Sequence, residues 1–247
     1  MRIRRFACMA GLFILDMILL SMLCFQNRKN EENAGLSRDR GSAGGYEVMS
    51  GDVAISSNMQ EERKIALTFD DGPNHIYTLP LLEGLKERGV KATFFLLGQE
   101  VVEKPEIAKR IAQDGHLIGN HSFYHEDLSQ MEAEEAVMYV SRTNEVIYEA
   151  TGQYPQLIRP PFGRANANSV YEPPMVEVLW TIDSRDWELS DVGTIMQNVL
   201  PNAKEDGIIL MHDASASSVQ AAFAIVDSLQ EQGYCFVTLD EILFDRH

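Results

Sequence analysis

The chain has few cysteines and no basic cluster after Arg63-Lys64. The first absence bears on disulfide bonds and the second on binding partners. Two of its three cysteines fall in an apolar N-terminal stretch, so Cys235 cannot form a disulfide within the rest of the chain. Of the 37 acidic residues 29 follow Glu62, against 14 of the 21 basic ones, which leaves that part with a formal charge of about −15. Binding to nucleic-acid phosphates needs clustered lysine and arginine, so nucleic acid is not an expected partner.

The first 25 residues predict a membrane anchor. Arg2, Arg4 and Arg5 precede an apolar stretch over 6–25, which is about the length that crosses a bilayer. No small-x-small cleavage site precedes Gln26, which favours an uncleaved signal anchor over a removed signal peptide. Because the basic residues lie mostly ahead of the span, we expect a single-pass protein of the cell membrane with its remainder on the extracytoplasmic side.

The rest of the chain divides into a linker and one domain. Residues 26–62 are rich in polar residues and glycine and show no helical or strand period, which predicts a flexible linker spanning roughly 35 Å. Over 63–247, short apolar runs alternate with amphipathic segments, and no internal repeat is present. This alternation predicts a parallel sheet, either closed as a barrel or open and doubly wound.

The individual elements follow from hydrophobic period and terminal signals. The expected strands are 64–69, 92–97, 117–118, 157–158, 176–182, 208–211 and 235–239. The expected helices are 78–88, 105–114, one near 193–202, and 218–231. A capping box of Ser129 and Glu132 is expected to open a further long helix that ends at Gly152.

Five polar clusters directly follow predicted strands, at 70–73, 121–125, 159–163, 183–187 and 212–213. Parallel α/β folds gather their chemistry beyond the carboxyl ends of the strands, so all five lie where a site is expected. Each cluster alone says little, since paired aspartates beside Gly-Pro are typical of a turn and two histidines four residues apart are common. His121 and His125 would lie on one face of a helical turn and could share a metal ion as neutral imidazoles.

Taken in order, the clusters resemble the polysaccharide deacetylase family, also called carbohydrate esterase family 4 or the NodB-homology domain. The matching runs are TFDDGP at 68–73, HSFYH at 121–125, RPPFG at 159–163, DSRDW at 183–187 and LMH at 210–212. The resemblance covers roughly residues 63–244. It implies an irregular (β/α) barrel with parallel strands that removes acetyl groups from amino sugars or other acetylated polysaccharides.

By the same resemblance, Asp71, His121 and His125 are the ligands of a divalent metal. Two histidines and one carboxylate leave coordination positions open, as in catalytic sites, with Zn²⁺ the default ion and Co²⁺ an alternative. Iron oxygenases use a similar ligand set. A second carboxylate, the proposed base Asp70, favours hydrolysis because a metal-bound water needs a nearby base. Adjacent strand residues point to opposite faces, so both aspartates reach one site only if the chain bends, and Gly72-Pro73 is expected to supply that bend.

The resemblance also implies what surrounds the base and the substrate. Arg159 would pair with the base and keep it ionised. The backbone N–H of Phe162 would join the metal in stabilising the oxyanion. Trp187 and Leu210 would wall a small pocket for the acetyl methyl group, although plain core packing explains these two apolar residues equally well.

Proton transfer to the leaving amine is assigned by the resemblance to His212. Asp186 would orient this general acid and raise its pKa. Asp183 and Asp213 receive no role, although Asp213 could cap a helix. The sequence departs from the family at 171–174 (YEPP), which interrupts the helix that usually follows the RPPFG run, so we expect the cleft wall there to differ.

The expected reaction is removal of N-acetyl groups from N-acetylglucosamine or N-acetylmuramic acid in peptidoglycan, since an exported, tethered domain lies beside that polymer. Deacetylation of chitin oligomers and of O-acetylated xylan would use the same motifs. A non-catalytic glycan-binding module is a third reading, which the intact Asp70, Arg159 and His212 argue against. A glycosidase needs two carboxyl groups roughly 5–10 Å apart across the bond, whereas Asp71 is committed to a metal.

Overall fold

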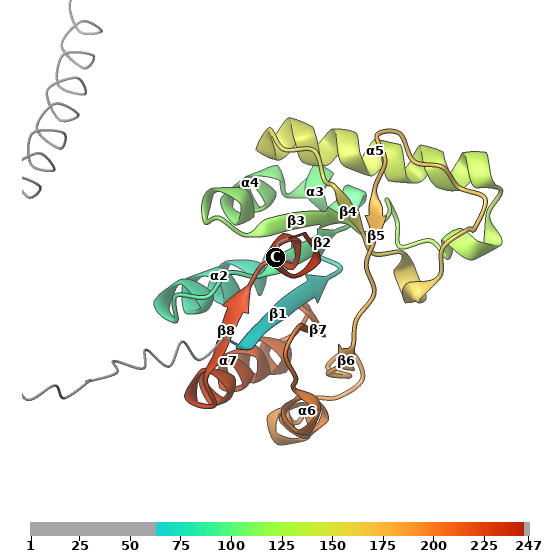
Figure 1. Cartoon of the computed structure of the whole chain (residues 1–247). Helices are drawn as coiled ribbons and strands as arrows, with labels where there is room; N and C mark the ends of the chain where they lie inside the picture. Colours follow the sequence, from blue (N-terminus) through green and yellow to red (C-terminus); the bar gives the residue numbers. More distant parts are fainter. Residues whose placement is uncertain (1–62, 245–247) are drawn as a thin grey trace, which may run out of the picture. The chain divides into compact units, whose positions relative to one another are not determined.

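Eight parallel strands form one curled sheet in the order β5-β4-β3-β2-β1-β7-β6, with β8 also paired to β1 (Figure 1). The computed structural model describes residues 63–244, so the expected anchor (1–25) and linker (26–62) lie outside the described residues. The strands are β1 Arg63–Asp70, β2 Thr93–Leu96, β3 Leu117–Asn120, β4 Leu157–Ile158, β5 Val176–Glu177, β6 Ile182–Asp183, β7 Gly207–His212 and β8 Tyr234–Val237. This irregular half-barrel confirms the expected parallel α/β fold.

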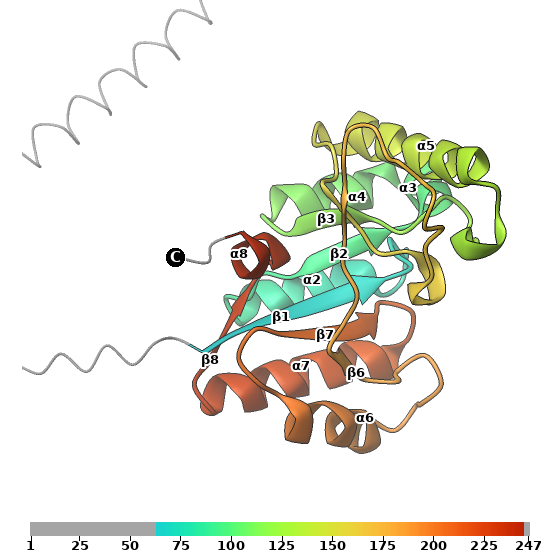
Figure 2. The same cartoon turned by 45° about the vertical axis from the view of Figure 1, so that its right-hand side comes forward.

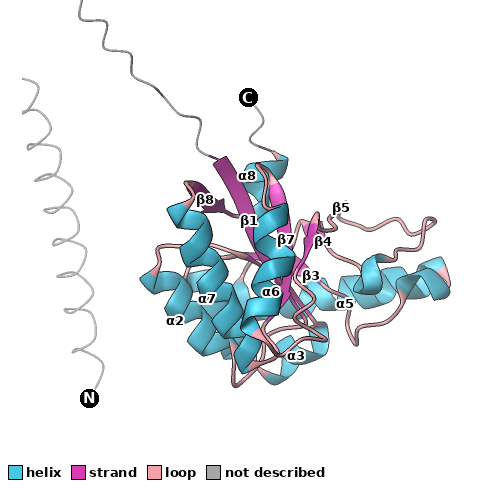
Figure 3. Ribbon diagram, turned by 90° about the horizontal axis from the view of Figure 1, so that it is seen from below, coloured by secondary structure: helices cyan, strands magenta, loops and turns pink. Residues whose placement is uncertain are grey.

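In the described part of the chain, six helices lie on the outside of this sheet, and a seventh, short helix packs against its inner face. They are α2 Thr78–Glu87, α3 Gly98–Glu103, α4 Pro105–Gln113, α5 Ala133–Thr151, α6 Val192–Val199 and α7 Ala216–Glu231, with the short α8 Leu239–Leu243 near the chain end. In Figure 3, α2, α6 and α7 cover one side of the strands, and their apolar side chains share one core with those of the sheet. Within 63–244, no helix has the length and apolar character needed to cross a bilayer.

The alternation of side chains along β1 explains how one strand serves both the core and the site. Ile65, Leu67 and Phe69 pack in the large core shared with the outer helices. The residues between them point to the opposite face of the sheet, because successive side chains of a strand alternate between its two faces. There Ala66 joins a small inner core with α8. The same inward row continues through Thr68 to Asp70, so β1 delivers a carboxylate to the carboxyl end of the barrel.

The apolar run over 176–182, predicted as one strand, forms two short strands at opposite edges of the sheet. The backbone N–H of Val178 still donates to the carbonyl of Ile158 in β4, at 2.9 Å. Three residues later the N–H of Thr181 donates to the carbonyl of Ile208 in β7, at 3.0 Å. The connecting segment therefore crosses the open side of the half-barrel from one edge to the other (Figure 2). Hydrophobic pattern alone cannot show that a run changes its partner strand.

The predicted capping box was also wrong. Ser129 lies in a 3₁₀ turn, Leu128–Gln130. The side chain of Asp127 caps this turn by accepting the backbone N–H of Ser129. The long helix α5 begins later, at Ala133, and its N-cap residue Glu132 makes no side-chain capping bond. The predicted end at Gly152 is confirmed, because this glycine takes the left-handed conformation (φ 75°) that closes many helices.

Candidate metal centre and active site

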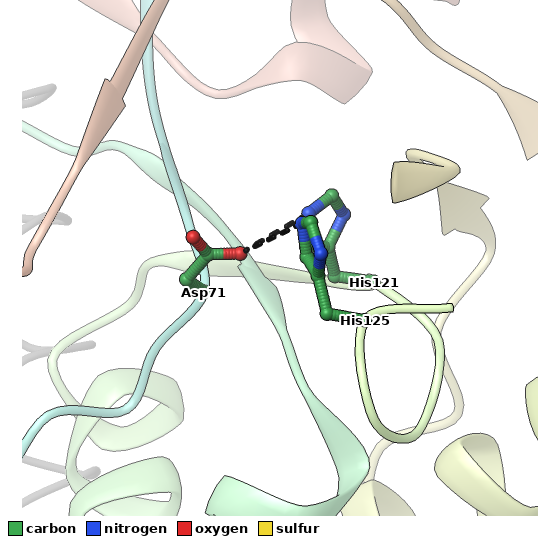
Figure 4. Close-up of side chains that lie close together, drawn as sticks. All are labelled: Asp71, His121 and His125. Atoms are coloured by element: carbon green, nitrogen blue, oxygen red, sulfur yellow. Dashed lines mark ion pairs between the residues drawn. The ribbon is translucent and has the colours of Figure 1, made fainter. Parts of the chain in front are cut away.

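Three side chains from two loops meet beyond the carboxyl ends of β1 and β3 (Figure 4). The Oδ1 atom of Asp71 lies 3.4 Å from Nε2 of His121 and 3.4 Å from Nε2 of His125. One ligand atom from each residue lies within 4.8 Å of the others. The structure thus brings together the three residues predicted to bind a metal.

The chemistry of these atoms fits a cation. Asp71 Oδ1 is buried and accepts no hydrogen bond from any described residue. His121 Nδ1 lies 2.6 Å from the backbone carbonyl of Arg159, which can only accept, so Nδ1 carries the hydrogen and Nε2 presents its lone pair. Burial lowers the pKa of His125, which favours the neutral imidazole. Burial acts to raise the pKa of Asp71, but the neighbouring imidazoles of His121, His212 and His125 outweigh it, so the net shift is downward and favours the carboxylate.

The backbone reaches this arrangement in a way the sequence did not predict. His121 and His125 are not on a helix but in an irregular loop, where Ser122 (φ 68°) and His125 (φ 65°) take the left-handed conformation. Asn120 supports the loop, because its Oδ1 accepts the backbone N–H of Ser122 at 2.8 Å. The bend that brings both aspartates to one site begins at Asp71 itself (φ 73°), one residue before the expected Gly72-Pro73.

Arg159 pairs with Asp70 in the interior, as predicted. The arginine has no exposed surface. Its NH1 group donates to Asp70 Oδ1 at 2.7 Å and to Thr68 Oγ1 at 2.8 Å, while the other nitrogens donate to the carbonyls of Val178 and Leu179, each at 3.2 Å. Burial lowers the pKa of Arg159, and the charge of Asp70 opposes that shift. The second oxygen of Asp70, Oδ2, lies 3.8 Å from His121 Nε2 and therefore faces the metal centre.

His212 is held by Asp186 at the end of the neighbouring strand. Asp70 and His212 are register partners of β1 and β7, which places the predicted base and acid on adjacent strands. The Asp186 carboxylate accepts from His212 Nδ1 at 2.8 Å and from the His212 backbone N–H at 2.9 Å. Burial alone would lower the pKa of His212, but the bond to Asp186 and the charges of Asp186, Asp70 and Asp71 raise it to about 9. The imidazole is therefore protonated at neutral pH.

The predicted oxyanion donor Phe162 and the two predicted pocket residues, Trp187 and Leu210, differ in exposure. The Phe162 ring packs edge-on against the His125 ring with centroids 4.7 Å apart, and Phe162 is 58% exposed. Trp187 is 62% exposed and Leu210 is buried in β7. Within 63–244, no hydrogen bond or ring contact ties either of these two to the metal ligands, so their role as a methyl pocket stays a prediction. No helix forms over 164–175 among the described residues, in keeping with the expected departure there.

Thr68 is a site residue that the sequence reasoning missed. Its hydroxyl donates to the carbonyl of Ile209 in β7 at 2.7 Å and accepts from Arg159, so it positions the arginine that holds the base. The available signal was its spacing, because a residue two positions before Asp70 in a strand must share its face.

The fold and these side chains define a parallel α/β half-barrel with a two-histidine, one-carboxylate centre beside an arginine-held carboxylate and an aspartate-held histidine. The family model for polysaccharide deacetylase matches residues 57–173. The solved structure of the peptidoglycan deacetylase PdaC from Bacillus subtilis superposes with a TM-score of 0.70 at 36% identity, covering 74% of this chain and 90% of that one. The chain belongs to the polysaccharide deacetylase family.

Two further relatives show how far that membership reaches. The peptidoglycan-N-acetylglucosamine deacetylase PgdA of Listeria monocytogenes is 36% identical over 184 residues, which cover 74% of this chain. The match covers only 40% of the Listeria protein, so this chain spans less than half the length of that relative. BA3943 of Bacillus anthracis, a family pseudoenzyme, superposes with a TM-score of 0.69 at 30% identity over 74% of this chain and 66% of its own. Membership alone therefore does not decide activity, and the site residues must.

Proposed function

We propose that this chain is a metal-dependent hydrolase that removes N-acetyl groups from the amino sugars of peptidoglycan and releases acetate. The observation that carries the proposal is one cluster of side chains. In it, an Asp71 oxygen without a hydrogen bond faces the Nε2 atoms of two histidines. Beside it lie the base Asp70 and the acid His212, each paired with a charged residue. A pure binding module has no need for such held proton-transfer groups.

Asp71, His121 and His125 would hold the metal. A divalent ion such as Zn²⁺ bound there would polarise the acetyl carbonyl and make a water molecule acidic enough to attack it. The three ligands leave positions open for both water and substrate. Co²⁺ could take the same place, because the donor set does not depend on a property unique to zinc.

Asp70 is the general base of the proposal. Its Oδ1 is occupied by Arg159, which leaves Oδ2 facing the metal centre to accept a proton from the attacking water. Arg159 is the ion-pair partner of this carboxylate, at 2.7 Å. Because Thr68 and two backbone carbonyls fix the arginine, the base is held in one orientation before substrate arrives.

His212 is the general acid. Breaking the C–N bond of an acetamide expels an amine, which leaves poorly unless its nitrogen gains a proton. The imidazolium of His212 supplies that proton, and Asp186 keeps it charged at neutral pH. The products are a free amine on the sugar and acetate. The backbone N–H of Phe162 is proposed to stabilise the oxyanion, and Trp187 with Leu210 to receive the acetyl methyl group.

Peptidoglycan is proposed as the polymer because the PgdA and PdaC relatives are named for deacetylation of peptidoglycan. A location at the outer side of the cell membrane, through an anchor at 1–25, is part of the same proposal, since it would keep the domain beside that polymer. Chitin oligomers and O-acetylated xylan are the rival substrates, because the same atoms would cleave their acetyl groups.

The deciding experiment measures acetate release by the full-length protein, in detergent and loaded with Zn²⁺ or Co²⁺. The substrates are purified peptidoglycan, chitin oligomers and acetylated xylan, and the Asp70→Asn variant is the matched control. Acetate from peptidoglycan at the highest rate supports the proposal. Faster release from either other polymer would replace the substrate, and binding without acetate release from any of them would favour a non-catalytic module.

A further inference from the structure

The loop that carries Asp71 rests on a buried carboxylate that has no part in the reaction proposed above. Asp213 follows β7 and is 1% exposed. Its side chain lies directly against Gly72, where an added Cβ atom would stand 2.8 Å from Oδ2 and 3.0 Å from Oδ1. A side chain at position 72 would have to displace the Asp213 carboxylate, so glycine is favoured there by the close approach of Asp213 and not by an unusual φ.

A short hydrogen-bonded network fixes the far side of the same loop. The hydroxyl of Thr78, the first residue of α2, donates to Asp213 Oδ2. The same oxygen of Thr78 accepts the backbone N–H of Asn74 at 2.6 Å. The side chain of Asn74 in turn accepts the N–H groups of Ile76 and Tyr77. Asp213 therefore touches the loop at Gly72 and reaches it again through Thr78 at Asn74.

The two contacts bracket the loop that leads away from Asp71. Burial raises the pKa of Asp213 to about 6, and hydrogen bonds from Thr78 and from backbone N–H groups oppose that rise. Asp71 is in the left-handed conformation, which costs a non-glycine residue free energy that its surroundings must offset. A buried group behind the loop supplies that support.

We propose that Asp213 is a positioning residue of the metal centre: packed on Gly72 and bonded to Thr78, it fixes the backbone of Asp71 so that Oδ1 faces both histidines. This inference rests on the metal centre of the proposed function. Groups that orient a ligand from behind commonly change metal affinity by about 10- to 100-fold when removed. We expect a loss of that size for Asp213→Ala.

The test measures Zn²⁺ affinity of the full-length protein by competition with a chromophoric chelator, together with the unfolding temperature of the metal-free form. Thr78→Val removes the hydroxyl at nearly constant volume and should weaken Zn²⁺ binding in the same direction as Asp213→Ala, by a smaller factor. Thr78→Ser restores the hydroxyl and should restore affinity. If Asp213→Ala does not fold, the two threonine variants decide the question alone.

Thr93→Val is the matched control. Thr93 is also buried, and its hydroxyl also accepts a backbone N–H, that of Leu239 at 3.1 Å, but at the beginning of β2. Its replacement should cost stability and leave Zn²⁺ affinity unchanged. Unchanged Zn²⁺ affinity in Thr78→Val and Asp213→Ala, with lowered stability alone, would overturn the inference. Metal binding is measured without any glycan, so a wild-type protein that releases no acetate would refute the proposed function and leave this result intact.

Discussion

Asp186 holds His212 with both oxygens of one carboxylate, through the imidazole Nδ1 at 2.8 Å and the backbone N–H at 2.9 Å. The hydroxyl of Ser184 donates to the same Oδ1 atom at 3.0 Å and completes the support. The bond to Nδ1 leaves the opposite nitrogen, Nε2, as the proton donor. One side chain thus sets the position, the tautomer and the charge of the proposed acid.

The Asp186→Asn variant should move the alkaline limb of kcat/KM to lower pH. A general acid works only while protonated, so its contribution is present below its pKa and lost as pH rises through it. Asp186 raises the pKa of His212 to about 9, and an amide keeps an acceptor but removes the charge. The check is a pH–rate profile, with Asp183→Asn as control, because among residues 63–244 the Asp183 side chain bonds only the backbone N–H of Arg185. An unmoved limb in Asp186→Asn would contradict the assignment.

Removing the acid and removing a ligand should have different effects. His125→Ala deletes one of three ligands, so both bound metal and activity should collapse. His212→Ala should keep its metal but lose about 10²- to 10⁴-fold in turnover of an acetamide, the usual worth of a positioned acid. For an activated aryl acetate, whose phenolate leaves unaided, the same variant should lose much less. Metal analysis and rates on both substrates test this, and equal losses on the two would exclude His212 as the acid.

Arg159→Met should destabilise the fold, because it leaves the Asp70 carboxylate buried without its partner. Breaking a buried ion pair in this way costs about 3–5 kcal/mol in the free energy of unfolding. The double variant Asp70→Asn, Arg159→Met removes the uncompensated charge and should recover part of the loss without recovering activity. Urea unfolding of Asp70→Asn, of Arg159→Met and of the double variant measures the effect. Additive losses in the double variant would mean that the pair is not coupled.

His116 should make the fold sensitive to acid. Burial, with help from the charge of Lys91, lowers the pKa of His116 from 6.5 to about 4, and its Nδ1 accepts the N–H of Ala92 at 3.1 Å. Its contribution is complete above pH 6.5 and is lost as pH falls from 6.5 toward 4, by on the order of 3 kcal/mol. His116→Asn keeps an acceptor but cannot titrate, so its stability should fall less over this window. Identical slopes in urea unfolding between pH 6.5 and 4 would refute the prediction.

Deleting residues 1–25 should release the protein from membranes while leaving its activity on soluble substrate intact, since the proposed anchor contributes location only. Fractionation and acetate release are the two measurements. A shortened protein that still sediments with membranes would contradict the anchor.

The site was more predictable than the fold around it. Asp70, Asp71, His121, Arg159 and His212 could be brought together from sequence because parallel strands place their carboxyl ends at one edge. The strand order could not be predicted from the sequence, because β5 and β6 come from one apolar run and lie at opposite edges of the sheet.

Residues that act through a neighbour were also out of reach of the sequence. The support that Asp213 gives to Gly72 depends on a contact between segments about 140 positions apart, and no local pattern records such a contact. The left-handed backbone conformation of Ser122 and His125 likewise depends on the folded loop, and residue type alone does not predict it.

The pairing of β1 distributes rigidity unevenly over the site. One edge of β1 is bonded to β7 from Ile65 to Asp70, and its other edge is shared, by β8 near the beginning and by β2 near the end. Amides in such a doubly protected strand exchange with solvent only when the whole domain opens, whereas a loop can open locally. Asp70 therefore lies at the end of a strand paired on both edges, whereas His125 lies in a loop. Local fluctuations of the loop can displace the ligand His125 and so admit or release a metal ion. The base Asp70 keeps its position on the strand meanwhile.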